Sequence, residues 1–242
     1  MENTITRIAI LVDGDNAQAK LLKPILEEVS KYGKVTIRRI YGDWTKPQMG
    51  SWKESLNDLS FTPIQKFSYT TGKNSTDSSL IIDAMDILHD NIVEGFCIVS
   101  SDSDYTGLAK RIREEGVFVM GIGEKKTPNA FVQSCEIFTY SENIVPVVTE
   151  VILKKSNHKK SQKPQTPQVD IKLVNKAYDM SVSEGSETHI SQVGLNIRKI
   201  NPSFDPRAFG FKTLTQLFES LTDYEVIRNK VGSLNHPMVK RK

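Results

Sequence analysis

The sequence predicts an α/β protein: a three-layer sandwich built on a mostly parallel sheet, followed by a small C-terminal winged-helix domain. Up to about residue 145, short apolar runs rich in β-branched residues alternate with amphipathic stretches of helical length. Strands and helices that alternate in this way form parallel sheets through right-handed crossovers, with helices on both faces. A lysine- and proline-rich segment then precedes three further helix-like stretches and a hairpin-like end.

Each predicted strand is a short, continuous apolar run, which is typical of strands buried on both faces of a parallel sheet. We expect the strand order 3-2-1-4-5, which places the first strand beside the fourth. The six predicted strands are Arg7–Val12, Val35–Tyr41, Phe61–Phe67, Gly95–Ser100, Val117–Gly121 and Glu136–Tyr140.

Helices fill the gaps between the strands, and glycines mark two of their ends. Gly33 and Gly116 each follow a helical pattern and precede a strand, which is the usual place for a helix-ending glycine. The predicted helices are Ala17–Lys31, Gln48–Leu59, Ser75–His89, Tyr105–Glu115 and Pro128–Ser134.

The composition changes after residue 148. We place the first domain at residues 1–148, a lysine- and proline-rich linker at 149–168, the winged-helix domain at 169–236 and a basic tail at 237–242. The linker has few apolar residues, so it is expected to be extended or disordered.

Helical spacing of apolar residues continues in the second domain. It predicts helices over Val169–Ser183 and His189–Ile200, and a third helix for which Thr213 is the N-cap. Tyr224–Val231 and Pro237–Val239 are expected to pair as a short hairpin. Three helices and a small hairpin are the outline of a winged-helix domain.

Composition and cysteine use are typical of a globular intracellular protein. Hydrophobic residues make up 38% and charged residues 25% of the chain, which is ordinary for a folded domain. The apolar runs are shorter than the roughly 18 residues of a membrane span, and the first residues lack a signal-peptide pattern. Cys97 and Cys135 lie in strand-like runs, so we expect buried thiols rather than a disulfide or a zinc site. We therefore expect a cytoplasmic protein.

The net charge of +3 is divided unevenly between the two halves. Residues 1–148 carry 16 Lys and Arg against 20 Asp and Glu, whereas residues 149–242 carry 16 against 9. An acidic half joined to a basic half suggests a catalytic module and a nucleic-acid-binding module. The alternative is a chance imbalance with solvated lysines.

Aspartates stand where two of the apolar strands end. Asp13 and Asp15 follow the first predicted strand, and Asp102 and Asp104 follow the fourth. In an open α/β sheet, ligands bind at the carboxyl ends of the strands, where the strand order reverses. Carboxylates brought together there repel one another, so a cluster needs a cation or raised pKa values to persist. The pattern favours a divalent-metal site.

Further polar residues are candidates for the same edge, each with a structural alternative. Asp77 opens the helix before the Asp102 strand, where the helix dipole alone favours an acid. Asp83 lies about 120° further round that helix, at the edge of the site or facing solvent. Asn16 either holds Asp13 or caps the next helix. The Ser101 hydroxyl binds phosphate, water or only the turn backbone.

Lysines are the candidates for contact with phosphates. Lys73 precedes the Asp77 helix, and the linker carries a basic run. Lysines in such positions contact backbone phosphates, although a solvated linker is the alternative. The linker candidates are Lys154, Lys155, Lys159 and Lys160.

Three segments resemble the NYN domain of the PIN-like nuclease group, whose bacterial members include the LabA-like proteins. The segments are Leu11–Ala17, Lys73–Asp83 and Val99–Tyr105, and the resemblance covers roughly residues 5–145. It implies a PIN-like, Rossmann-like fold and Mg²⁺- or Mn²⁺-dependent hydrolysis of phosphodiester bonds, usually in RNA. Asn16 would support the site and Asp83 would lie at its periphery. The metal ligands that the resemblance implies are Asp13, Asp77, Asp102 and Asp104.

Residues 169–236 resemble the LOTUS domain, also called OST-HTH, which often accompanies NYN domains. The most recognisable stretch is Phe209–Leu214, followed by Leu217 and Phe218. The resemblance implies binding of single-stranded or structured RNA, or of a protein partner instead. A homo-oligomer is a further possibility that the sequence leaves open.

Two other hypotheses compete with a metal-dependent endoribonuclease. Asp13-Gly14-Asp15 also resembles the motif of haloacid-dehalogenase phosphatases, with Asp13 as nucleophile and Asp15 as general acid. The residues after Asp15 depart from that motif, however, and no cap domain is evident. The other hypothesis is a non-catalytic RNA-binding or adaptor protein. All the expected acids are present, so the nuclease is the favoured prediction.

Overall fold

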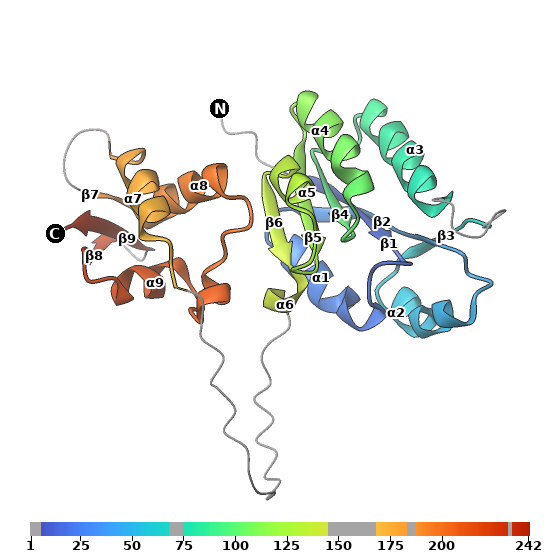
Figure 1. Cartoon of the computed structure of the whole chain (residues 1–242), viewed down its shortest axis with the longest axis horizontal. Helices are drawn as coiled ribbons and strands as arrows, with labels where there is room; N and C mark the ends of the chain where they lie inside the picture. Colours follow the sequence, from blue (N-terminus) through green and yellow to red (C-terminus); the bar gives the residue numbers. More distant parts are fainter. Residues whose placement is uncertain (1–5, 68–74, 145–167, 183–186, 232–233) are drawn as a thin grey trace, which may run out of the picture. The chain divides into compact units, whose positions relative to one another are not determined.

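The computed structural model describes residues 6–67, 75–144, 168–182, 187–231 and 234–242 (Figure 1). The chain divides into two compact units, Met1–Val145 and Pro146–Lys242. Residues 149–167 of the predicted linker, including its four candidate lysines, lie outside the described residues, as does Lys73. In the described parts of the chain, no helix is long and apolar enough to cross a membrane.

The first unit is built on a six-stranded sheet in which every neighbouring pair is parallel. The strand order is β3-β2-β1-β4-β5-β6, so the expected neighbours β1 and β4 do lie side by side. All six predicted strands are present, although β3 is shorter than expected. Their bounds are β1 Arg7–Asp13, β2 Lys34–Gly42, β3 Thr62–Gln65, β4 Gly95–Val99, β5 Phe118–Gly123 and β6 Ile137–Tyr140.

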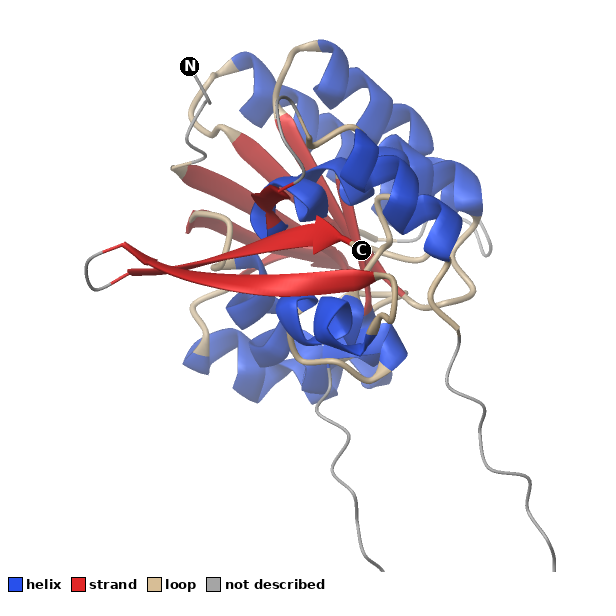
Figure 2. Cartoon of the chain, turned by 90° about the vertical axis from the view of Figure 1, so that its left-hand side faces the viewer, coloured by secondary structure: helices blue, strands red, loops and turns tan. Residues whose placement is uncertain are grey.

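Helices cover both faces of this sheet, which confirms the three-layer sandwich (Figures 1 and 2). Three predicted helices begin as 3₁₀ helices, at Ala19–Leu21, Pro47–Trp52 and Ser103–Tyr105, and become α-helical only afterwards. Such 3₁₀ turns are common at helix N-termini. The α-helices of the unit are α1 Leu22–Val29, α2 Lys53–Asp58, α3 Ser75–His89, α4 Thr106–Glu114, α5 Asn129–Ser134 and α6 Ser141–Ile144.

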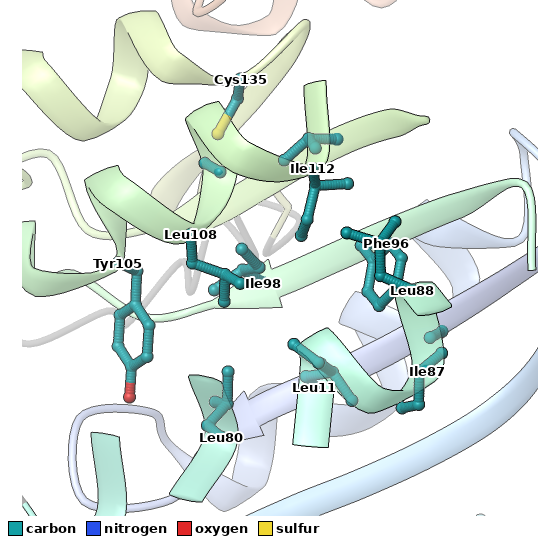
Figure 3. Close-up of a cluster of buried hydrophobic side chains, with 14 of the residues drawn as sticks. Leu11, Leu80, Ile87, Leu88, Phe96, Ile98, Tyr105, Leu108, Ile112 and Cys135 are labelled. Carbon is teal, nitrogen blue, oxygen red and sulfur yellow. The ribbon is translucent and has the colours of Figure 1, made fainter. Parts of the chain in front are cut away.

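Each face of the sheet has its own hydrophobic core. Side chains from α3, α4 and α5 pack on one face around Phe96 and Ile98 of β4, as Figure 3 shows in part. Side chains from α1 and α2 pack on the other face around Ile10 and Val12 of β1. Both cysteines are free and buried, as predicted. The two cores hold the carboxyl ends of β1 and β4 in fixed positions.

The C-terminal unit contains helices and a small antiparallel sheet, as the predicted winged-helix outline requires. Figure 2 shows β8 and β9 as a long hairpin. Thr213 caps the third helix as predicted, because its hydroxyl accepts the Gln216 amide at 3.2 Å. The elements are α7 Ile171–Asp179, β7 Glu187–His189, α8 Ile190–Ile200, a 3₁₀ helix Pro206–Phe209, α9 Leu214–Ser220, β8 Tyr224–Val231 and β9 Leu234–Arg241.

The end of the chain differs from the basic tail predicted at 237–242. Residues 237–241 belong to β9, which pairs with both β8 and β7. Val239 is fully buried, and the Arg241 guanidinium lies 4.7 Å from the Tyr178 ring centre and 2.8 Å from an Asp179 oxygen. The predicted pairing of Pro237–Val239 with Tyr224–Val231 is thus confirmed, and β9 extends further in both directions than the sequence indicated.

Candidate metal centre

The parallel pairing of β1 with β4 brings their carboxyl ends together. In this ladder Val12 lies opposite Val99, so Asp13 and Ser100 come next on the two neighbouring strands. The Ser100 hydroxyl donates a hydrogen bond of 2.9 Å to Asp13 Oδ2. The loop after β1 is fixed to β2 as well, because the Gly14 amide donates to the Tyr41 carbonyl at 2.8 Å.

Asp13 is fully buried and surrounded by hydrogen-bond donors. The Asn16 amide donates to Asp13 Oδ2 at 2.7 Å, and the Asp15 backbone N–H donates to Oδ1 at 3.2 Å. Asn16 therefore holds Asp13, and it does not cap the following helix. Burial raises the pKa of Asp13, and the donors Asn16, Ser100 and Asp15 N–H counteract that increase without cancelling it.

Three other carboxylates form a group that can hold a metal ion. Asp77, Asp102 and Asp104 each offer an oxygen, and these oxygens all lie within 4.8 Å of one another. Asp77 comes from the first turn of α3, and the other two come from the segment after β4. Asp102 also caps the 3₁₀ helix Ser103–Tyr105, since it accepts the Asp104 amide at 3.0 Å. Asp104 is exposed, so the group opens to solvent.

Asp13 is not one of the three acids of this group. The two are still close enough to interact, because the charge of Asp13 raises the pKa of Asp77. That Asp13 itself contacts a metal stays a prediction.

Tyr105 was not predicted as a site residue, and it contacts the carboxylate group directly. Its side chain is fully buried, and its hydroxyl donates to Asp77 Oδ1 at 2.7 Å. Burial raises the pKa of Asp77, the charges of Asp13, Asp102 and Asp104 raise it further, and the Tyr105 hydrogen bond lowers it. An aromatic residue at the start of a helix usually packs in the core, so no sequence signal indicated that this hydroxyl contacts Asp77.

Two predicted residues have partners elsewhere. Asp83 forms an ion pair with Arg39 and accepts the Tyr41 hydroxyl, so it lies beside β2 and outside the group of three. In the described residues, Ser101 forms no hydrogen bond with the carboxylates. Its hydroxyl accepts a hydrogen bond of 2.9 Å from the backbone N–H of Glu124 and so fixes the loop after β5.

Asp15 contacts the helix that carries Asp77. Thr76 donates to Asp15 Oδ2 at 3.0 Å, which ties the β1 loop to the first turn of α3. Thr76 was not predicted, since a threonine near a helix start is common without such a contact. The hydrogen bond places the two acidic segments side by side.

The comparison with protein families agrees with this geometry. The model of the NYN domain matches residues 7–142. The chain belongs to the NYN domain family. The model of the OST-HTH/LOTUS domain matches residues 165–236, so the NYN domain is followed by an OST-HTH/LOTUS domain, as the resemblance implied. The two domains together support an RNA-related nuclease or binding function.

Likeness to individual proteins is weak. No curated protein matches this NYN protein. A crystal structure of a protein of unknown function from Vibrio parahaemolyticus is 20% identical, covers 58% of this chain and 95% of its own, and has a TM-score of 0.49. A solution structure of an uncharacterized protein from Nitrosomonas europaea is 24% identical, covers 37% of this chain and 90% of its own, and has a TM-score of 0.30.

The donor set of the NYN domain suits a hard divalent cation. Mg²⁺ and Mn²⁺ prefer carboxylate oxygens, and Mg²⁺ usually keeps several waters beside one or two carboxylates. Three carboxylates of which one is exposed provide both oxygens and solvent access.

Proposed function

We propose that the protein is a metal-dependent ribonuclease, and specifically an endoribonuclease, that hydrolyses RNA phosphodiester bonds. The observation that carries this proposal is the convergence of Asp77, Asp102 and Asp104 at the carboxyl edge of the parallel sheet of an NYN domain. Two separate chain segments supply these acids. The charges of Asp102 and Asp104 raise the pKa of Asp77, and a bound cation would relieve this repulsion.

The proposed metal site consists of these three acids with Asp13 as a fourth ligand. A bound Mg²⁺ or Mn²⁺ would activate a water molecule and stabilise charge on the phosphate. Asn16 and Ser100 hold the Asp13 carboxylate by hydrogen bonds of 2.7 and 2.9 Å. Asp104 is the exposed acid, so we place the substrate phosphate on its side of the group.

We propose RNA as the substrate because an OST-HTH/LOTUS domain follows the nuclease-like domain. Residues 149–242 carry 16 Lys and Arg against 9 Asp and Glu, which provides attraction for a phosphate backbone. Lys73 and the linker lysines 154, 155, 159 and 160 are the proposed phosphate contacts. RNA of a shape that the second domain recognises would thus be held near the NYN domain.

A cleavage assay with matched variants tests the proposal. Full-length protein is incubated with labelled single-stranded RNA, structured RNA or DNA, in Mg²⁺, Mn²⁺ or EDTA. We expect internal cleavage of RNA that requires the metal and is lost in Asp77→Asn. The control is Asp90→Asn, at an exposed position outside the carboxylate group, which should cleave like the wild type.

The same assay distinguishes a nuclease from an adaptor. An adaptor would bind RNA in a gel-shift experiment and leave it intact in every metal tested. Cleavage that persisted equally in Asp77→Asn would show a contaminating nuclease and would remove the support for this site.

A further inference from the structure

Tyr105 joins the hydrophobic core to the carboxylate group. Its ring is fully buried at one end of the cluster that includes Leu80, Ile98 and Leu108 (Figure 3). It also packs against Phe131, with the ring centres 6.3 Å apart. These contacts restrict the Tyr105 ring to one orientation, because protein interiors are close-packed. The position of its hydroxyl is therefore fixed by the core.

That hydroxyl links the two chain segments that supply the carboxylates. It donates to Asp77 Oδ1 at 2.7 Å, and Tyr105 itself ends the 3₁₀ helix that Asp102 caps. Asp77 belongs to α3, whereas Asp102 and Asp104 follow β4. The hydrogen bond thus fixes the first-turn carboxylate of α3 relative to the other two acids.

We propose that Tyr105 is a positioning residue for the metal site: its hydroxyl occupies one oxygen of Asp77 and so directs the other toward Asp102 and Asp104. This inference rests on the proposed metal-dependent function. Partners that hydrogen-bond a metal-ligating carboxylate set its orientation, and their removal typically weakens metal affinity 10- to 100-fold. Among the described side-chain hydrogen bonds, the one from Tyr105 is the one that holds the Asp77 carboxylate.

Tyr41 provides a matched control within the same domain. It is also fully buried, and its hydroxyl also donates to an aspartate, Asp83. Asp83 is paired with Arg39 and lies outside the carboxylate group. Tyr41→Phe and Tyr105→Phe therefore remove the same chemical contact from a buried tyrosine, one away from the site and one at it.

The test is calorimetric titration of the full-length protein with Mn²⁺ alone, without RNA. We expect Tyr105→Phe to weaken Mn²⁺ binding about tenfold and Tyr41→Phe to leave it within twofold of the wild type. The double variant Asp77→Asn/Tyr105→Phe should bind no more weakly than Asp77→Asn alone, because Tyr105 acts through Asp77.

Each contrary outcome has one meaning. If the wild type bound Mn²⁺ and Tyr105→Phe bound it equally well, the inference on Tyr105 would fall and the proposed function would stand. If the wild type bound no Mn²⁺, the proposed metal site would fall and this inference with it. If Tyr105→Phe lowered the metal-free melting temperature far more than Tyr41→Phe, the hydroxyl would serve the fold and not the site. If Tyr105→Phe lost affinity further in the Asp77→Asn background, Tyr105 would not act through Asp77 alone, and the inference would fall, since the hydroxyl also interacts with Asp13.

Discussion

The Ser100 hydroxyl lies 2.9 Å from Asp13 Oδ2 and donates a hydrogen bond to it across the β1–β4 pairing. Both residues are buried, with exposures of 2% and 0%. The bond therefore joins two strand ends that are 87 positions apart in the sequence. It also shows that Asp13 is held from the β4 side as well as from its own loop, by Asn16.

Replacement of the buried Asp13 should stabilise the metal-free protein at high pH. Burial raises the pKa of Asp13 in the folded state above its value in the unfolded state. Below the unfolded-state pKa this difference costs no stability, and the free energy of unfolding falls as the pH rises from the unfolded-state pKa through the folded-state pKa. Asp13→Asn does not ionise. In EDTA it should therefore melt at a higher temperature than the wild type at pH 8, and the advantage should disappear near pH 4, the ordinary range of an aspartate.

Thermal unfolding between pH 4 and pH 8 measures this effect, with Asp90→Asn as the exposed control. A lower melting temperature for Asp13→Asn at pH 8 would mean that its ionised form is well stabilised by Asn16 and Ser100. That result would mean that the pKa of Asp13 is not raised in the folded protein.

Loss of one acid from the group of three should abolish stabilisation by metal. A ligand at 100 times its dissociation constant stabilises the folded state by about 2.7 kcal/mol. Saturating Mn²⁺ should thus raise the melting temperature of the wild type and of Asp90→Asn. Asp102→Asn, which removes an oxygen from the group, should show little shift, and a wild-type shift in that variant would exclude Asp102 as a ligand.

Gly14 is required by the close approach of the β1 loop to β2. A Cβ at this position would lie 2.8 Å from the Tyr41 carbonyl oxygen and 2.9 Å from a Met49 methyl carbon. The backbone oxygen cannot move aside easily, so Gly14→Ala should cost about 1–3 kcal/mol, as overpacking does. Gly107→Ala is the control, because a Cβ there meets nothing within 4 Å; urea unfolding of both should show destabilisation only at position 14.

The linker lysines should set the salt dependence of RNA binding. Each phosphate contact to a single strand contributes about 0.7 to the slope of log affinity against log salt. Replacement of Lys154, Lys155, Lys159 and Lys160 by serine should therefore weaken binding and flatten the slope. Filter binding at several salt concentrations measures both quantities. An unchanged slope would assign RNA contact to the folded domains alone.

The sequence predicted those features that depend on local pattern. Continuous apolar runs identified β1 and β4, and the acids that follow them placed a charged edge at their carboxyl ends. Asp77 was found because it opens the helix that precedes β4. These signals lie within short stretches of sequence, so they can be recognised without knowledge of the tertiary structure.

The features that were missed depend on contacts between distant segments. The Tyr105 hydroxyl matters only because α3 brings Asp77 within 2.7 Å of it. Asp83 is neutralised by Arg39, 44 positions away in β2, and no periodicity marks that pairing. The pairing of β9 with β7 was missed in the same way, since it too is long-range.

The acidic edge also has a consequence for the order of events. Residues 1–148 carry four more acidic than basic side chains, and Asp77, Asp102 and Asp104 are concentrated at one place. A surface of this sign repels RNA phosphates, and the repulsion is strongest at low salt. A divalent cation reverses much of that local charge. Under the proposed function, the metal would therefore have to bind before the RNA or together with it, and the NYN domain by itself would discriminate against RNA until the metal was in place.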